Sequence, residues 1–556
     1  MDLGGWLRSL GLEQYEAAFR ENAIPTELGV PLSTETITHL QFIIFGSLIC
    51  YLLIKERHVF VRLISIGKEK LRLWPFPLLK ERSGLDRNAD GGRWQRRKEA
   101  NPRTEKEGSK EEDINMASIA RNVLILAAAL SGAAFSAPAA AQNEQFIPIL
   151  SYRTGPYAVN GAPYANGVLD YYNLVNERDG GINGVKILVE ECETSYATDK
   201  GVECYERLKS KGATGAAFIN PLSTGITFAL TEKTATDKIP IITMGYGRAD
   251  SKNGAVFAYN FPLLGTYWSA ADIAIQHVAK ELGGFDKLKG RKISLLYHDS
   301  PYGKEPIPML QVLAQKYGFE FTPIPVTHPG VEQKSQWLAI RQNRPDYVLV
   351  WGWGVMNSTA IKEAASVAYP RDKMIGVWWS GAEPDVTPAG DQATGYKSLM
   401  LQHGAGRFPV HADIEKYVYA RGKGLTEPGK VGEILYNRGI VNAMLGVEAI
   451  RKAQEKFGQK SLTGEQIRWG LENLNLSDAR LQELGFAGML KPIRVSCSDH
   501  EGTRDGRVQQ WDGKGWKVIS DWYTADEALI DPLVNDVSTK YAAEKKIKPR
   551  DCAKES

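Results

Sequence analysis

The stretch Gly215-Ala-Ala-Phe-Ile-Asn-Pro-Leu-Ser-Thr-Gly-Ile-Thr-Phe-Ala-Leu230 contains the signals that decide the fold. It begins with a short apolar run that is typical of a buried strand, and it passes through a polar loop into a segment with helical character. The same order of strand, loop and helix recurs before and after it. Strands that alternate with helices of about 10–15 residues form βαβ units, so the stretch predicts a parallel sheet.

Repeats of this order predict an α/β protein with two lobes. In the first series we expect strands at 146–151, 185–190, 215–219 and 239–243 and helices at 165–177, 200–211 and 225–237. In the second we expect strands at 292–297, 319–326, 347–351 and 374–378 and helices at 303–317, 333–341 and 358–368. Helices at 411–422, 432–457 and 463–474 and a β-hairpin at 508–520 follow. Two Rossmann-like lobes of this kind bind ligands at the carboxyl ends of their strands, in the crevice between them.

The composition restricts the function. The chain has 556 residues, of which 24% are charged and 43% are apolar, and its formal net charge is only +3. This near-neutral balance argues against a nucleic-acid partner, which would require a basic face or stripe. The sequence has no G-x-S-x-G, H-E-x-x-H or G-x-x-x-x-G-K-[ST] motif, so serine-hydrolase, zinc and nucleotide chemistry lack support. We therefore expect no enzyme, no catalytic residue, no cofactor and no metal ion.

A signal peptide is expected inside the chain, at 116–141. Arg121 supplies its positive charge, 123–130 forms its apolar core, and Ala139-Ala-Ala141 is a small-residue cleavage site. These parts predict export to the periplasm after cleavage near Ala141. The alternative interpretation is a buried alanine-rich helix, which the proline after the core and the polar residues beyond it disfavour.

Three segments precede the expected signal peptide. Residues 80–115 carry many charges without apolar periodicity, so we expect a disordered linker there and hypothesise that Met116 is the natural start. Residues 34–79 include Leu40-Gln-Phe-Ile-Ile-Phe-Gly46 and resemble the C-terminal end of a branched-chain amino acid permease. The alternative is a membrane anchor at 40–54, which would hold an unprocessed chain at the membrane. Residues 1–24 resemble a truncated sterile alpha motif domain that is too short to form its own core.

The cysteines suit an oxidising compartment. Cys192 lies at the end of one expected strand and Cys204 lies in the next expected helix, so a disulfide between them would fix a βα loop. Cys497 is a candidate partner of Cys552 in the C-terminal region. Free buried thiols are the alternative for both pairs. Cys50 lies in the apolar N-terminal segment and is expected to take no part.

Polar residues follow two strands of the first series. Ser223 and Thr224 lie between a strand and a helix, where hydroxyls and free backbone N–H groups form a site suited to a carboxylate. Capping of the helix by these hydroxyls is the alternative, and both roles are compatible. After the next strand, Tyr246 and Arg248 follow glycines that allow a ligand to approach, and Arg248 is a candidate for bidentate contact with a carboxylate. A solvated loop position is the alternative for Arg248.

Tryptophans follow two strands of the second series. Side chains alternate along a strand, so one of the adjacent Trp378 and Trp379 is expected to face the core. We expect Trp353 and Trp379 to form pocket walls and Trp351 and Trp378 to pack in the core. The alternative places all four in the core.

The order of these loops resembles the periplasmic leucine/isoleucine/valine-binding protein family over nearly all of 142–556. The resemblance is carried by five short motifs: Ser151-Tyr-Arg-Thr-Gly-Pro-Tyr157, Asn220-Pro-Leu-Ser-Thr224, His298-Asp-Ser-Pro-Tyr-Gly303, Gly352-Trp-Gly354 and Ser380-Gly-Ala-Glu383. It implies a type I periplasmic binding fold at 142–540, with lobes joined by a multi-strand hinge. The first lobe would span about 142–263 and 386–495, and the second about 264–385 and 496–540.

The same resemblance implies the function and the ligand contacts. The protein would be a monomeric substrate-binding protein of an ABC importer, which carries a small amino acid or a related carboxylate or amide to its permease. Ser223 and Thr224 would hold the α-carboxylate, and Glu383 and Tyr302 would meet the ammonium group. Tyr157 and Trp353 fall where the family places contacts with the ligand's side chain.

One loop departs from the family pattern. The family usually has a threonine after the strand at 239–243, where this chain has Gly247 beside Tyr246 and Arg248. One carboxylate donor is therefore missing and the pocket is more aromatic, so small aromatic acids are an alternative cargo. Family membership alone does not fix the ligand. A ligand-sensing receptor of the same fold remains a further alternative.

Overall fold

The computed structural model describes residues 144–402 and 404–555. They belong to the second of the two units into which the chain divides, Asp113–Ser556. The expected signal peptide, charged linker, permease-like segment and sterile-alpha-motif-like fragment, together with Cys50, lie outside the described residues. Among the helices of the described part, none is both long enough and apolar enough to cross a membrane.

The first lobe contains a parallel sheet. Its named strands are β1 (Glu144–Ser151), β2 (Lys186–Glu193), β3 (Ile241–Met244) and β4 (Asn260–Leu263). β1 pairs with β2, and β3 pairs with β4. Residues 216–219 join the two pairs, because the Ala217 N–H donates to the Phe146 carbonyl oxygen at 2.9 Å and Ile219 bridges to Ile241. The expected strand at 215–219 is therefore present only as this short connection.

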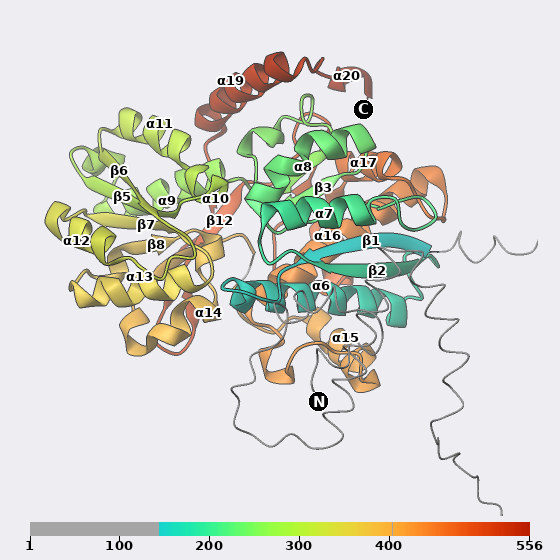
Figure 1. Ribbon diagram of the computed structural model, residues 1–556, viewed down its shortest axis with the longest axis horizontal. Coiled ribbons are helices and arrows are strands. Elements are labelled where there is room, and N and C mark those ends of the chain that lie inside the picture. The colour runs from blue at the N-terminus through green and yellow to red at the C-terminus, as the bar shows by residue number, and fades with distance from the viewer. Residues whose placement is uncertain (1–143, 403, 556) are drawn as a thin grey trace, which may run out of the picture. The chain divides into compact units, whose positions relative to one another are not determined.

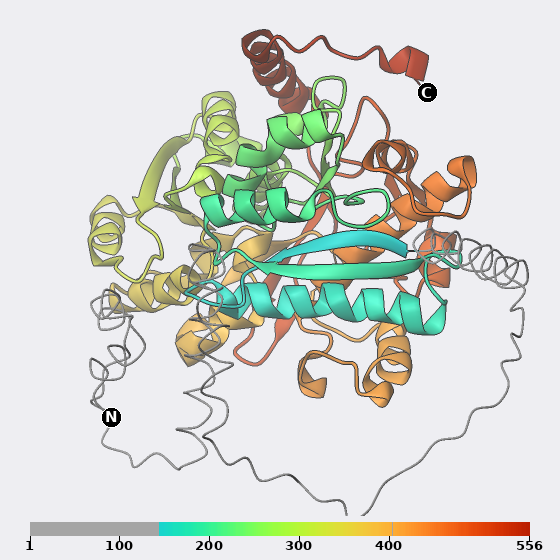
Figure 2. The ribbon, with the colours of Figure 1, turned by 45° about the vertical axis from the view of Figure 1, so that its right-hand side comes forward.

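Helices cover both faces of this sheet (Figures 1 and 2). α6 (Ala158–Arg178) and α16 (Ile434–Phe457) pack against one another on one face, and α7 (Thr198–Leu208) and α8 (Thr224–Asp237) cover the other. Alternate side chains of β1 accordingly enter two different cores, as expected for a strand buried on both sides. α6 and α16 approach closely at Gly167, where a Cβ atom would lie 2.3 Å from the Tyr436 carbonyl oxygen.

Smaller elements complete the first lobe. They are α15 (Pro409–Tyr417), α17 (Gly464–Glu472), β10 (Asn475–Leu476), α18 (Asp478–Glu483) and β11 (Ile493–Arg494). The single helix expected at 411–422 is instead α15 followed by a 3₁₀ turn, Tyr419–Arg421. The helix expected at 165–177 begins earlier, at Ala158.

The second lobe contains a mixed sheet with the order β13-β12-β9-β8-β7-β5-β6, and β14 pairs with β12. Its strands are β5 (Lys292–His298), β6 (Glu320–Val326), β7 (Tyr347–Trp351), β8 (Met374–Gly376), β9 (Lys397–Met400), β12 (Asp505–Trp511), β13 (Trp516–Val518) and β14 (Tyr523–Thr524). Strands β5 to β9 are parallel, and β12 and β13 form the expected antiparallel hairpin. The helices of this lobe are α9 (Tyr267–Leu282), α10 (Pro301–Lys304), α11 (Ile307–Tyr317), α12 (Lys334–Asn343), α13 (Val355–Ser366) and α14 (Glu383–Val386).

The chain passes between the lobes after β4, after β9 and before β12. The first and last of these passages lie side by side, because the Leu264 N–H donates to the Glu501 carbonyl oxygen at 3.0 Å. The lobe boundaries differ from the expected ones. β9 pairs with β8 through Ile375 and Lys397, so residues up to 400 belong to the second lobe rather than the first.

The C-terminal region returns to the first lobe. Helix α19 (Glu527–Lys545) contacts both lobes, since Lys252 pairs with Asp531 at 2.6 Å and Lys316 lies 3.8 Å from Asp526. The short helix α20 (Cys552–Glu555) then lies against the first lobe (Figure 1). The sequence places residues 496–540 in the second lobe, whereas the contact of Asp531 with Lys252 holds part of this region against the first lobe.

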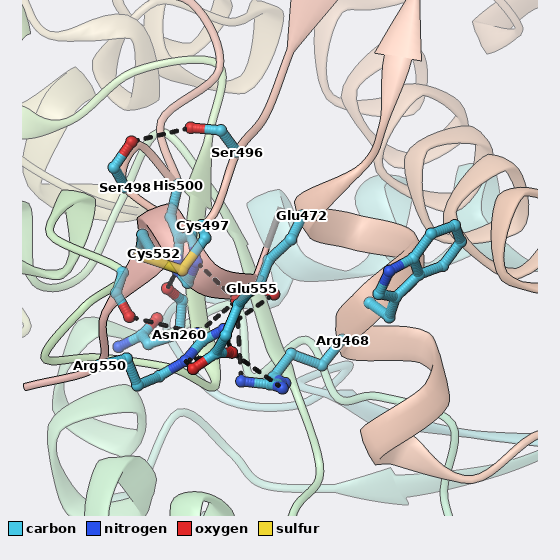
Figure 3. A network of polar contacts seen from close by, with 12 residues as sticks. Asn260, Arg468, Glu472, Ser496, Cys497, Ser498, His500, Arg550, Cys552 and Glu555 are labelled. Carbon is cyan, nitrogen blue, oxygen red and sulfur yellow. Dashed lines mark hydrogen bonds and ion pairs between the residues drawn. A yellow bond between two sulfur atoms is a disulfide. The ribbon is translucent and has the colours of Figure 1, made fainter.

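Both disulfides form in the structure. Cys192 is joined to Cys204 with a Cα–Cα distance of 5.8 Å, and Cys497 is joined to Cys552 with a distance of 5.5 Å. Around the second disulfide, Glu472 binds Arg550 at 2.5 Å and His500 at 3.3 Å (Figure 3). Burial alone would raise the pKa of Glu472, but the hydrogen bonds from His500 and Arg550 lower it to about 2. These contacts hold the C-terminal tail against α17.

Candidate ligand-binding site

A small cavity lies where the carboxyl ends of strands from both lobes meet. It is lined by Tyr196, Leu222, Ser223, Thr224, Tyr246, Tyr267, Tyr302, Trp353 and Trp379. The first five residues come from loops after first-lobe strands, and the last four come from the second lobe. The structure thus brings together six of the residues singled out in the sequence: Ser223, Thr224, Tyr246, Tyr302, Trp353 and Trp379.

The first lobe contributes the N-terminus of α8. Ser223 is its N-cap and accepts a hydrogen bond from the Ile226 N–H at 3.4 Å, while Thr224 begins the helix. Both side chains are buried, at 4% and 2% exposure, and both line the cavity. The first N–H groups of a helix lack partners within it and attract anions. Capping and carboxylate binding are therefore compatible at this position.

Hydrogen bonds fix the loop that precedes α8. Leu222 adopts a positive φ of 45°, which is uncommon for a branched residue. Its N–H donates to the Tyr246 hydroxyl oxygen at 2.7 Å, and that hydroxyl donates to Asn220 Oδ1 at 2.7 Å. The positions of the loop and of the helix terminus are consequently fixed by hydrogen bonds within the protein.

The second lobe contributes an aromatic wall that also bonds to the first lobe. Trp353 and Trp379 lie edge to face, with ring centroids 5.7 Å apart. The Trp353 indole N–H donates to the Tyr152 hydroxyl oxygen at 3.1 Å, and that of Trp379 donates to the Gly245 carbonyl oxygen at 2.9 Å. These hydrogen bonds join the lobes, so the structure describes their closed arrangement.

The neighbouring tryptophans are completely buried. Trp351 lies in the core, and Trp378 donates its indole N–H to the same Gly245 carbonyl oxygen at 2.7 Å. Gly245 has a φ of 65°, and an added Cβ atom would lie 2.9 Å from Trp378 Nε1 and 2.4 Å from Leu401. A glycine is therefore required where Trp378 of the second lobe packs against this first-lobe loop.

No charged side chain lines the cavity among the described residues. Burial raises the pKa values of Tyr246, Tyr267 and Tyr302 well above their ordinary value. These phenols are consequently neutral and available as hydrogen-bond donors. The cavity thus presents uncharged hydroxyls at one side and aromatic rings around the rest.

Glu383, which we expected beside an ammonium group, does not line the cavity. The residue begins helix α14, and its Oε2 accepts a hydrogen bond from the Ile434 N–H at the start of α16, at 3.1 Å. Burial raises its pKa to about 7. The neighbouring Asp385 is also engaged, since Oδ1 accepts from Asn160 and Asn357 and Oδ2 accepts from the Ala382 N–H.

Tyr157 lies at the edge of the site rather than in its lining. Its hydroxyl and His298 Nε2 share a hydrogen bond of 2.7 Å between the lobes. Its ring centroid lies 4.5 Å from that of Tyr196, which does line the cavity. Tyr157 therefore supports closure and the position of Tyr196.

Arg248 lies away from the cavity and is not solvated. Its Nη2 pairs with Asp250 at 2.7 Å. The guanidinium stacks over the rings of Phe257 and Tyr541, at 4.5 and 4.2 Å from their centroids. The solvated-loop alternative is therefore wrong, because Asp250 and aromatic residues that are remote in the sequence enclose Arg248. Contact between Arg248 and a ligand carboxylate stays a prediction that this placement does not support.

Replacing Arg248 with methionine is expected to lower the free energy of unfolding by about 3–5 kcal/mol, because Asp250 would be left as an unpaired buried charge. Ligand affinity should stay within about two-fold of the wild type, because Arg248 does not reach the cavity. Urea unfolding and titration calorimetry measure the two effects. A large loss of affinity in a folded variant would contradict this placement.

The residues that the sequence did not indicate are Tyr196, Leu222 and Tyr267. Tyr196 follows the end of β2. It could therefore have been found in the same way as the other candidates, which were chosen because they follow the ends of strands. Tyr267 begins helix α9 shortly after the end of β4, a strand that the sequence did not indicate. Leu222 belongs to the same loop as Ser223 but carries no polar group.

The profile of the periplasmic binding protein family matches residues 144–516. The chain therefore belongs to this family, whose members act outside the cytoplasm, bind small-molecule ligands and deliver them to a permease. The expected fold class and the expected role as the substrate-binding protein of an ABC importer are confirmed. Cleavage near Ala141 stays a prediction.

Solved structures share the fold. One, described as an ABC transporter permease from the Pseudomonas fluorescens group, is 46% identical, with a TM-score of 0.69, and covers 74% of this chain and 99% of its own. A branched-chain amino acid ABC transporter from Thermus thermophilus with bound valine is 21% identical, with a TM-score of 0.58, and covers 70% and 99%. A solute-binding protein from R. palustris in complex with benzoate is 16% identical, with a TM-score of 0.52, and covers 69% and 98%. No curated protein matches the sequence.

Proposed function

We propose that the protein binds a small carboxylate with a flat apolar body, such as an aromatic acid, and carries it unchanged to its permease. The observation that supports this proposal is the pairing of Ser223 and Thr224, at the N-terminus of α8, with a cavity whose other walls are mostly tyrosine and tryptophan. The helix terminus suits the carboxylate. The rings suit an aromatic body, which gains from edge-to-face and stacked contacts.

An α-amino acid is a weaker match for this cavity. An ammonium group requires acceptors, and carboxylates are the acceptors that neutralise its charge. Glu383 binds the N-terminus of α16 and Asp385 binds two asparagines, so neither faces the cavity. The fold itself accommodates both ligand classes, since the relatives described above include one with valine and one with benzoate.

The closed arrangement explains how a ligand would signal its presence. Interlobe hydrogen bonds at Tyr157, Trp353 and Trp379 form only when the lobes meet. A ligand that contacts Ser223 from one side and Trp353 from the other adds interactions to the closed state alone. It therefore shifts the population towards that state. We propose that the closed monomer is the form that docks on the permease, and that no chemical step occurs.

A thermal-shift screen followed by titration calorimetry tests the ligand class. Benzoate and 4-hydroxybenzoate are the positive probes, and valine and leucine are the competitors. A ligand present at about 100 times its dissociation constant adds about 2.7 kcal/mol to the free energy of unfolding. Stabilisation by the aromatic acids and not by the amino acids is the expected result. The reverse order would contradict the proposal.

A further inference from the structure

Within residues 144–402 and 404–555, Arg438 is a buried cation without a hydrogen-bond partner. It lies in the second turn of α16 and has no exposed surface. None of its three guanidinium nitrogens finds an acceptor among the described residues. Burial lowers the pKa of Arg438 to about 10, so the side chain remains charged at neutral pH. A charge in this position is costly unless something compensates for it.

The nearest carboxylates do not pair with Arg438. Asp385 and Glu383 act on it electrostatically, but their oxygens are bonded to other groups. Arg248 provides a contrast within the same chain. It is also buried and stacked on aromatic rings, yet it forms a direct ion pair with Asp250. Arg248 is thus paired with a carboxylate, and Arg438 is not.

Arg438 lies directly behind the wall of the ligand site. Its guanidinium carbon is 4.9 Å from the centre of the Trp379 ring, which lines the cavity. Tyr267 and Tyr302, which also line the cavity, are among the groups that affect the pKa of Arg438. Charges in a protein interior interact more strongly than charges in water, because the effective dielectric constant is low. A negative charge in the cavity would therefore be attracted by Arg438.

We propose that Arg438 is a specificity-determining residue of the ligand site, which favours an anionic ligand over a neutral ligand of the same shape. It acts through Trp379, whose ring it contacts, and is thus a positioning and electrostatic residue rather than a direct ligand of the carboxylate. This inference rests on the proposed function and deepens it. The inference assigns the selectivity for a charged ligand to α16, a helix of the first lobe, and not to the loops that follow the strands.

Benzoate and benzamide test this inference, because they share a shape and differ in charge. The wild-type protein should bind benzoate at least about 10-fold more tightly than benzamide, as expected for a desolvated charge interaction. Arg438→Met should remove most of this preference by weakening benzoate binding, with benzamide binding changed by less than about two-fold. Arg438→Lys should retain the preference. Arg248→Met is the matched control and should leave the benzoate-to-benzamide ratio unchanged.

The ratio of benzoate affinity to benzamide affinity distinguishes charge selection from a structural role, because a distorted cavity would weaken the binding of both probes. If Arg438→Met does not fold, Arg438→Gln takes its place in the same comparison. Equal binding of both probes by the wild type, or an unchanged ratio in the folded charge-removing variant, would overturn the inference and leave the proposed function standing. If the wild type binds neither probe, the proposed function fails and the inference fails with it.

Discussion

Replacing Ser223 with alanine and Thr224 with valine in one chain is expected to weaken benzoate binding by at least about 100-fold. Each hydroxyl would hydrogen-bond a charged carboxylate, and such bonds contribute roughly 1.5–3 kcal/mol each. Two of them correspond to about 3–6 kcal/mol, and each 1.4 kcal/mol is a factor of about ten in affinity. Titration calorimetry on the purified variant measures the loss.

Thr231→Val is the matched control for this variant. Thr231 lies in the same helix, is buried, and donates its hydroxyl to the Thr227 carbonyl oxygen at 2.7 Å. It does not line the cavity, so its loss should change stability but leave the dissociation constant within about two-fold. The double variant should also lose about 1 kcal/mol of stability, because Ser223 caps α8. Wild-type affinity in the double variant would exclude the α8 terminus as the carboxylate site.

Trp379→Ala is expected to weaken binding by about 3 kcal/mol, a factor of roughly 100, as for a central aromatic contact. The change removes a wall of the cavity and an interlobe hydrogen bond to the Gly245 carbonyl oxygen. It also removes the ring that Arg438 contacts. Quenching of tryptophan fluorescence by benzoate should diminish in parallel.

Trp379→Phe separates the ring from the hydrogen bond. Phenylalanine keeps an aromatic wall but has no N–H group, and Trp378 still donates to Gly245. We expect an intermediate loss of about 1 kcal/mol, the net value of one buried hydrogen bond. An alanine variant with wild-type affinity, as measured by calorimetry, would show that the ligand binds elsewhere.

Much of the fold follows from periodicity in the sequence. Strands such as Tyr347–Trp351 are apolar throughout because helices cover both faces of the sheet, and this pattern is easy to recognise. β9 was missed because Lys397–Met400 is short and begins with a lysine. α19 was missed because its position depends on contacts with the first lobe that no local pattern reveals. Asp531 pairs with Lys252, and the Tyr541 ring stacks on Arg248.

The site could be predicted where it depends on the ends of strands. Ser223, Tyr302 and Trp353 follow strands of parallel sheets, and the carboxyl ends of such strands converge on the cavity. Glu383 also follows the end of a strand in the sequence. However, it begins a short helix that directs its carboxylate to the N-terminus of α16 and not into the cavity. Arg438 comes from the interior of a long helix, where an arginine ordinarily indicates an exposed face.

The most direct test of the central claim is a crystal structure of the protein with benzoate. The carboxylate should lie at the N-terminus of α8, within hydrogen-bonding distance of the Ser223 and Thr224 hydroxyls, and the ring should contact Trp353 and Trp379. Benzoate bound outside this cavity, or bound in it with the carboxylate directed away from α8, would contradict the account.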